Sequence, residues 1–148
     1  MAQTTSRDPE RLDSERFDPE RFDPGRSDSG RRNRSLGARG EALAADHLEA
    51  LGCEVLARNW RAGRQGELDL VVQDGGSIVA VEVKTRSGRG YGSPFEAITA
   101  RKAARLRRLL HEWVRQHPTR ASGLRIDAVA VILLPGEPPR IEHLRGIS

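Results

Sequence analysis

Cysteine, long apolar runs and zinc-binding spacings are nearly absent from this sequence. Its 148 residues include one cysteine, Cys53, so an intramolecular disulfide is excluded and a reducing cytoplasm is the expected compartment. No His-x-x-x-His or Cys-x-x-Cys spacing occurs, which argues against a structural zinc site. The longest apolar run, residues 128–134, is far shorter than the roughly 20 residues of a membrane span. Because the N-terminus also lacks the apolar segment of a signal peptide, we expect a soluble cytoplasmic protein without membrane contact.

Large apolar side chains are scarce in residues 1–34. From Asp8 the pattern Asp-[Pro/Ser]-[Glu/Gly]-Arg-x repeats five times. After the first methionine, the large apolar residues of this segment are Leu12, Phe17 and Phe22. Burial of so few side chains cannot offset the entropy of ordering the segment, so we predict a disordered tail at 1–34 and one folded domain at 35–148. Eight arginines balance eight acidic residues in the tail, and the formal charge of +4 therefore belongs to the domain. The tail is either an interaction arm or an extension without a specific role.

Residues 66–86, GELDLVVQDGGSIVAVEVKTR, have the pattern of a β-hairpin. Two β-rich segments flank Asp74-Gly75-Gly76-Ser77, and the glycines tolerate the positive φ values that a tight turn needs. A two-residue loop at Gly75-Gly76 places Asp69 opposite Glu82, and Glu67 opposite Lys84. A three-residue loop would shift the register by one residue and would separate Asp69 from Glu82.

One face of this hairpin is charged and the other is apolar. Directly opposed residues have Cβ atoms roughly 4.5–5.5 Å apart, where like charges destabilise a sheet. The facing carboxylates of Asp69 and Glu82 therefore suggest a bound cation. The alternative is a solvated face with a Glu67–Lys84 ion pair. We expect the apolar face to be buried, and it carries Leu68, Leu70, Val72, Val79, Val81 and Val83.

A first helix is predicted at residues 36–51, and Gly52 stands where a glycine commonly ends a helix. At about 100° per residue, Glu41 lies on the same side of this helix as Leu48. A carboxylate on the inward side serves either a functional site or the helix dipole. Residues 53–60 follow as the first strand.

A second, strongly amphipathic helix is predicted to begin at Ser93 or at Thr99 and to end near Gln116. Its apolar side carries Ala103, Leu106, Leu110, Trp113 and Val114, and its basic side carries Arg101, Arg105, Arg108 and Arg115. The basic side is either a solvated face or a phosphate contact. Lys102 lies off this side, where it can face the hairpin. The glycine-rich segment 85–92 is either a mobile flap or a plain connector.

The order of these elements predicts an α/β sandwich. Residues 124–134 have the apolar composition of an interior strand, and residues 140–144 form a short edge strand. The sheet is therefore mixed: an antiparallel three-strand meander, a parallel strand reached through a helical crossover, and the edge strand, flanked by two main helices. Asp127 interrupts the interior strand, and it is either a paired buried acid or a group that supports the site.

The pattern of Asp69 followed by Glu82-Val83-Lys84 suits phosphodiester hydrolysis. This reaction must stabilise charge on a phosphate oxygen and generate hydroxide near neutral pH, and a divalent cation held by carboxylates can do both. Lys84 beside the cation can orient or help deprotonate the attacking water and stabilise negative charge.

Several segments together resemble one known family. They are GE-x-LAA around Glu41, GELDLV ending at Val71, VAVEVKTR at 79–86, the helix with Lys102, and RIDAVAV at 125–131. They are similar to the YraN family of bacterial proteins, which is regarded as a family of endonucleases of the restriction-endonuclease-like PD-(D/E)XK class, akin to archaeal Holliday junction resolvases. The resemblance extends over about residues 37–144. It implies a restriction-endonuclease-like fold and, for the chemistry, a nuclease site.

The resemblance also implies roles for individual residues. Asp69 and Glu82 would bind Mg²⁺ or Mn²⁺, Glu41 would bring a further carboxylate to the metal, and Lys84 would be the catalytic lysine. We assign supporting roles to Glu67 and Lys102. Phosphate contacts without base selectivity are expected from Arg61, Arg64, Arg86, Arg89, Arg101, Arg105 and Arg108.

These patterns predict a metal-dependent endonuclease that acts on DNA rather than RNA, including branched or junction DNA. One alternative is a nucleic-acid-binding module that has the nuclease fold but weak or no catalysis. Another is a structural adaptor that acts through protein contacts alone. Because resolvases place two sites across a junction, a symmetric homodimer is compatible with the first prediction.

Overall fold

The computed structural model describes residues 24–88 and 92–147. The chain divides into two compact units, residues 1–32 and 33–148, and all the strands belong to the second unit. The elements along the chain are helix α1 (Pro24–Ala50), strands β1 (Glu54–Arg61), β2 (Glu67–Asp74) and β3 (Ser77–Arg86), the 3₁₀ helix η2 (Pro94–Ala97), helix α2 (Ala100–Gln116), and strands β4 (Gly123–Ile132) and β5 (Arg140–Leu144).

Helix α1 begins earlier than we predicted. It starts at Pro24 and not at residue 36, so residues 24–34, which we assigned to the disordered tail, are helical. Proline suits the first position of a helix, and each residue added to an existing helix gains one hydrogen bond, so a polar segment can extend a helix that packing has already formed. The rest of the predicted tail, residues 1–23, lies outside the described residues.

The C-terminal end of α1 agrees with the prediction. Gly52 has φ of 93°, and the Gly52 and Cys53 amides donate to the Glu49 and Leu48 carbonyls at 2.9 and 3.0 Å. This pair of bonds is the Schellman arrangement, which needs a residue in the left-handed region and therefore favours glycine. The turn directs the chain at once into β1.

The sheet has the predicted mixed topology. Its order is β1-β2-β3-β4-β5, with antiparallel pairing throughout except between β3 and β4, which are parallel. Helix α2 lies in the β3-to-β4 crossover, and its N-cap is Thr99, whose hydroxyl accepts the Lys102 amide at 3.2 Å. Ser93 instead caps the short η2 segment. The predicted α/β class and strand order are therefore confirmed.

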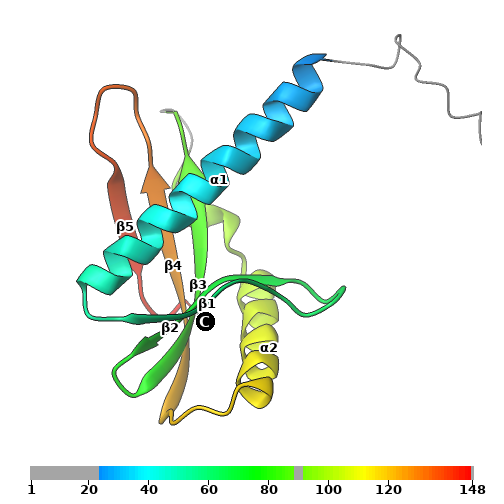
Figure 1. Ribbon diagram of the computed structural model, residues 1–148, viewed down its shortest axis with the longest axis vertical. Coiled ribbons are helices and arrows are strands. Elements are labelled where there is room, and N and C mark those ends of the chain that lie inside the picture. Colours follow the sequence, from blue (N-terminus) through cyan, green and yellow to red (C-terminus); the bar gives the residue numbers. More distant parts are fainter. Residues whose placement is uncertain (1–23, 89–91, 148) are drawn as a thin grey trace, which may run out of the picture. The chain divides into compact units, whose positions relative to one another are not determined.

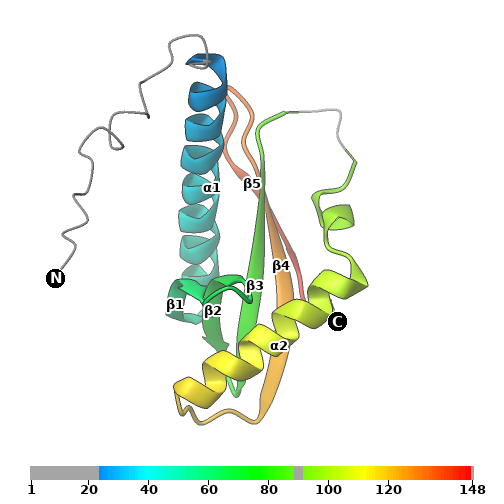
Figure 2. The ribbon, with the colours of Figure 1, turned by 90° about the vertical axis from the view of Figure 1, so that its right-hand side faces the viewer.

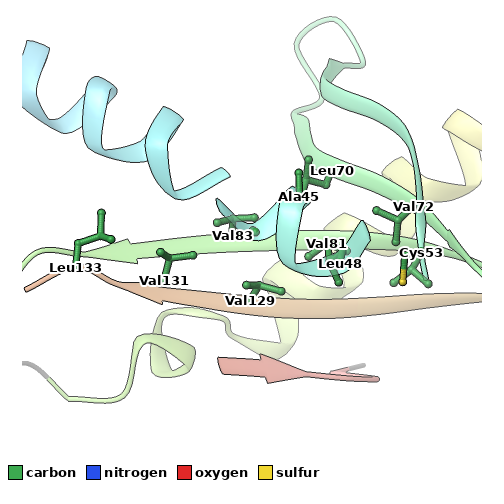
Figure 3. Close-up of a cluster of buried hydrophobic side chains, with 12 residues drawn as sticks. Ala45, Leu48, Cys53, Leu70, Val72, Val81, Val83, Val129, Val131 and Leu133 are labelled. Carbon is green, nitrogen blue, oxygen red and sulfur yellow. The ribbon is translucent and has the colours of Figure 1, made fainter. Parts of the chain in front are cut away.

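The two helices cover opposite faces of this sheet (Figures 1 and 2). On one face Ala44, Ala45 and Leu48 of α1 pack on a valine-rich surface from β2, β3 and β4, which Figure 3 shows. On the other face Leu106, Leu109, Leu110 and Trp113 of α2 pack on Leu68, Val71, Ile78, Ala80 and Ile126. The alternation of side chains along a strand sends consecutive residues of β3 to these two layers.

The hairpin register is the predicted one from Asp74–Ser77 to Leu70–Val81. Beyond Leu70 the regular pairing of β2 with β3 ends, and Oδ2 of Asp69 accepts the Val83 amide at 2.9 Å. The side chain thus takes the place of a backbone acceptor. Leu68 then lies with the α2 cluster, so our assignment of Leu68 to the same face as Leu70 is wrong. At Leu68, β2 has separated from β3 but is still paired with β1, where Leu68 lies opposite Trp60 of the same α2 cluster.

Candidate active site

A pocket of about 240 Å³ lies where β2 leaves β3, under α2. The interruption at Asp69 opens the space, and α2 forms its other wall. The pocket is lined by Gly66, Glu67, Asp69, Glu82, Lys102, Arg105, Leu106 and Leu109. Its charged residues come from β2, β3 and α2, so only the folded chain assembles them.

Asp69 is largely desolvated in this pocket. Burial, together with the neighbouring charge of Glu82, raises its pKa to about 7, although the hydrogen bond from Val83 acts in the opposite direction. Glu41 and Glu67 add smaller contributions of the same sign as Glu82. A carboxyl group with a pKa near neutrality among other carboxylates favours a cation as its partner.

Glu82 is 6% exposed and lies between the two lysines of the chain. Its Oε1 atom is 2.7 Å from Nζ of Lys102 and 3.8 Å from Nζ of Lys84. Burial and the nearby charge of Lys102 lower the pKa of Lys84. Burial also acts to lower the pKa of Lys102, but the hydrogen bond and charge of Glu82, with smaller contributions from Lys84 and Asp69, together outweigh it and raise the pKa of Lys102. The two lysines therefore have different electrostatic environments.

Glu41 approaches the same group of charges from α1. Its side chain bonds to Asn59 of β1, and burial raises its pKa, with Glu67 and Glu82 adding to the effect. Asn59 has φ of 49°, a left-handed conformation that asparagine adopts more easily than most residues. Sequence reasoning missed Asn59; an asparagine inside an otherwise β-rich segment was the available signal.

Gly40 lets α1 pass close to β3 immediately before Glu41. A Cβ atom at Gly40 would overlap Oγ1 of Thr85, the residue after Lys84. No side chain fits there without movement of the helix or the strand. Gly40 therefore sets the distance between the Glu41 and Lys84 ends of the site.

Replacing Gly40 with alanine is expected to destabilise the protein by about 2 kcal/mol, because overpacking typically costs 1–3 kcal/mol. The measurement is urea unfolding of both proteins. A matched control is Gly37→Ala on the same helix, where a Cβ atom would meet nothing within 4 Å. That change should stabilise the helix by a few tenths of a kcal/mol up to about 1 kcal/mol. Equal effects at the two positions would contradict the close approach of α1 to β3 at Gly40.

The predicted pairing of Glu67 with Lys84 is wrong. Oε2 of Glu67 instead lies 3.3 Å from Nε of Arg61, which is the partner of Glu67 in the β1–β2 ladder. Lys84 forms an ion pair with Glu82. The reason is the same departure of β2 from β3 at Asp69, which removes Glu67 from the position opposite Lys84. Glu67 nevertheless lines the pocket.

The arginines that we assigned to phosphate contact differ in their surroundings. Arg101 and Arg108 are exposed on α2, and Arg64 is exposed in the loop before β2. Arg105 is exposed too, but its Nε and Nη2 donate to the Gln65 carbonyl at 3.0 and 2.8 Å, which ties that loop to α2. Arg86 is half-buried at the end of β3. Arg89 and residues 90–91 of the predicted flap lie outside the described residues, while Thr85 and Arg86 at its start belong to β3.

Asp127 is the paired buried acid of our two alternatives. It is 1% exposed, and it bonds to Arg125 at 2.8 Å, to His143 at 2.8 Å and to the Gly146 amide at 3.0 Å. Burial alone would raise its pKa, but these partners outweigh burial and lower it. Asp127 is not among the residues that line the pocket, so its role is to hold β4, β5 and the C-terminal segment together.

Replacing Asp127 with asparagine is expected to destabilise the protein by about 3–5 kcal/mol, because a broken buried pair leaves a charge uncompensated. Since the folded-state pKa of Asp127 is below the unfolded value, its contribution is present above about pH 4 and is lost as the pH falls further. Thermal unfolding of both proteins from pH 7 to pH 3 measures this. A difference between them that does not shrink in acid would contradict the assignment.

Both lysines of the chain meet at Glu82, while the other 23 basic residues are arginines. Lysine and arginine differ in geometry, hydration and the ease with which the proton leaves. In a chain that uses arginine elsewhere, a lysine is an unusual choice. This composition was a signal for Lys102 that sequence reasoning did not use.

Fold and site together define an α/β protein whose pocket joins acidic residues of β2 and β3 to Lys102 and Arg105 of α2, with Lys84 beside Glu82. The model of "Uncharacterised protein family UPF0102" matches residues 40–131. The chain belongs to this family, which confirms the likeness to YraN proteins.

In the part of the chain that the structure describes, no helix is long and apolar enough to cross a membrane.

Relatives in other bacteria match nearly their whole length. A UPF0102 protein of Frankia casuarinae is 55% identical over 112 residues, which are 76% of this chain and 94% of the relative. One of Arthrobacter is 50% identical over 113 residues, 76% of this chain and 95% of the relative. Among solved structures, the Holliday junction resolvase Hjc of Archaeoglobus fulgidus aligns with 23% identity and a TM-score of 0.37, covering 72% of this chain and 75% of that one.

The donor set of the pocket fits a hard divalent cation. Asp69 and Glu82 supply carboxylate oxygens, and Mg²⁺ is commonly held by one or two carboxylates with water and phosphate completing its shell. Among residues 24–88 and 92–147, no three His, Cys, Asp or Glu side chains are grouped closely enough to hold a metal ion. A ligand role for Glu41 remains a prediction.

Proposed function

We propose that this chain is a metal-dependent endonuclease that hydrolyses phosphodiester bonds in DNA, branched or junction DNA included. The observation that carries the proposal is the meeting of Asp69, Glu82 and both lysines at one point, beside the arginine-bearing side of α2. A carboxyl group with a raised pKa beside a buried carboxylate that two lysines share is costly to assemble, and such groups gather preferentially at functional sites.

Asp69 and Glu82 would hold Mg²⁺ or Mn²⁺. When bound, such an ion neutralises charge on the phosphate and makes a bound water acidic. The Val83 amide fixes the orientation of the Asp69 carboxylate before any ligand arrives. Glu41, through its charge, makes the pocket more attractive to a divalent cation, and Asn59 holds it in place.

Lys84 is the residue that we propose to act on the reacting atoms. Its pKa is lowered by burial and by Lys102, so it exchanges a proton closer to neutral pH than an ordinary lysine does. In its charged form it stabilises negative charge as that charge develops on the phosphate. The exposed arginines Arg64, Arg101 and Arg108 supply phosphate contacts that position DNA without selecting a sequence.

The test is cleavage of labelled four-way junction, flap, duplex and single-stranded DNA, and of RNA, by the purified full chain. We expect cleavage of at least one DNA substrate with Mg²⁺ or Mn²⁺ and none with excess chelator. Native mass measurement with and without junction DNA tests the homodimer. Absence of cleavage on every substrate with either metal would overturn the proposal.

A second candidate is a nucleic-acid-binding module with this fold and no cleavage. It is favoured by the ion pair of Lys102 with Glu82, which neutralises a carboxylate that the nuclease needs. Binding of DNA that weakens steeply with salt, without cleavage, would identify this function. Absence of binding even at low salt would point instead to an adaptor that acts through protein contacts.

A further inference from the structure

Lys102 is held directly against the carboxylate that we assign to the metal. It lies in the first turn of α2, where its amide donates to the Thr99 hydroxyl at 3.2 Å, so the backbone at this point is fixed. Its side chain is 36% exposed and reaches from the helix to the sheet. Nζ of Lys102 is 2.7 Å from Oε1 of Glu82, whereas Nζ of Lys84 is 3.8 Å from the same atom.

A single oxygen therefore faces two ammonium groups. An ammonium at 2.7 Å from a carboxylate oxygen satisfies its charge and occupies one of its lone-pair directions. A hard divalent cation needs the same oxygens. An ion that enters this pocket must accordingly displace the ammonium of Lys102 or accept a weakened ligand.

We propose that Lys102 is a positioning residue that competes with the divalent metal ion for Glu82. In the metal-free protein its ammonium holds the nearly buried Glu82 carboxylate in place, and it leaves that carboxylate when the metal binds. This inference rests on the proposed function, since it assigns to Glu82 the role of metal ligand. Breaking the Lys102–Glu82 ion pair then lowers the affinity of the pocket for the metal ion.

The identity of the residue supports competition over permanent pairing. An arginine at this position could form two parallel hydrogen bonds with Glu82, which would be harder to displace. The chain has 23 arginines and uses lysine only here and at position 84. A flexible point charge is suited to a contact that must break, because it can leave without loss of a bidentate geometry.

The test is a titration of the full chain with Mn²⁺ in the absence of DNA. The electron paramagnetic resonance signal of free Mn²⁺ measures how much of the ion is bound. Lys102→Met should tighten binding about five- to tenfold, because it removes one unit charge beside a ligand in a partly exposed site. Lys102→Arg should weaken binding severalfold. A purely structural role would weaken binding in both variants, so the opposite signs separate the two explanations.

Two further variants serve as controls. Arg115→Met removes an exposed charge from the last turn of the same helix and should leave the Kd for Mn²⁺ within about twofold of the wild type. Asp69→Asn should abolish binding at the site. Thermal unfolding of each variant confirms that it is folded.

The outcomes separate this inference from the proposed function. If the wild type binds Mn²⁺ and Lys102→Met binds it equally or more weakly, the competition is wrong and the nuclease proposal stands. If Mn²⁺ binds neither the wild type nor Lys102→Met, or if Asp69→Asn binds it as well as the wild type does, both are overturned.

Discussion

Replacing Lys84 with alanine is expected to lower the rate of DNA cleavage by about 10²–10⁴-fold, the range typical of lost proton transfer and charge stabilisation. Binding of DNA should persist, because Lys84 is half-buried against Glu82 and the exposed arginines lie elsewhere. Single-turnover cleavage measures the first effect, and fluorescence anisotropy with labelled DNA measures the second.

Arg108→Ala is the matched control for this variant. Arg108 is exposed on α2 and is not among the residues that line the pocket. Its loss should weaken DNA binding and reduce the salt dependence by about one phosphate contact, with the single-turnover rate at saturating DNA unchanged.

Cleavage by Lys84→Ala at the wild-type rate would contradict a catalytic role for Lys84. The reaction would then need a different proton acceptor.

Replacing Asp69 with asparagine is expected to abolish cleavage and, at the same time, to stabilise the metal-free protein. The folded-state pKa of Asp69 is about 7, against about 3.9 for an ordinary aspartate. Each pKa unit corresponds to about 1.4 kcal/mol, so ionised Asp69 destabilises the fold by an amount on the order of 2–4 kcal/mol. Asparagine removes this charge, and its side-chain oxygen can still accept the Val83 amide.

The raised pKa of Asp69 also makes the stability of the protein depend on pH. Because the pKa of Asp69 is higher in the folded protein, the unfolded chain loses its proton first as the pH rises. The stability of the wild type should therefore fall between about pH 4 and pH 7 and level off above that, apart from other groups. The difference between Asp69→Asn and wild type should grow over the same interval. Urea unfolding at several pH values, with chelator present, measures it.

Asp74→Asn provides a control with the same chemical change on the same strand. Asp74 pairs with Arg125 at 2.7 Å, so its charge stabilises the fold and its loss should cost stability. The two substitutions are therefore expected to change the free energy of unfolding in opposite directions. If Asp69→Asn also destabilised the protein at pH 8, the Asp69 carboxylate would not be strained in the metal-free state, and the fold would not need a cation to balance its charge.

The contrast between Asp69 and Asp127 shows how one residue type serves two purposes in this fold. Asp127 is surrounded by Arg125, His143 and a backbone amide, and its pKa is lowered. Asp69 has one backbone donor and several carboxylate neighbours, and its pKa is raised. The first is satisfied by the protein itself. The second keeps an electrostatic cost that a bound cation would offset, and this cost supports the proposed metal position.

Much of the architecture could be predicted from local patterns. The Asp74-Gly75-Gly76-Ser77 turn determined the hairpin register, because a two-residue loop leaves one way to pair the flanking strands. The glycine after α1 predicted where that helix ends, the apolar side of α2 predicted its buried face, and the continuous apolar run of β4 predicted an interior strand. Each of these signals depends on neighbouring residues and on a regular period, so a single sequence contains it.

The sequence by itself therefore determined the order of elements, the mixed sheet and the hairpin register as far as the Leu70–Val81 pair. Tertiary structure alone decided that the ladder stops at Asp69, that Leu68 moves to the α2 layer, that Glu67 pairs with Arg61, and that Lys102 reaches Glu82. These outcomes depend on competition between groups far apart in the chain, such as the Asp69 carboxylate and a backbone carbonyl for the Val83 amide. The periodicity of the sequence does not show which of these two groups accepts the Val83 amide.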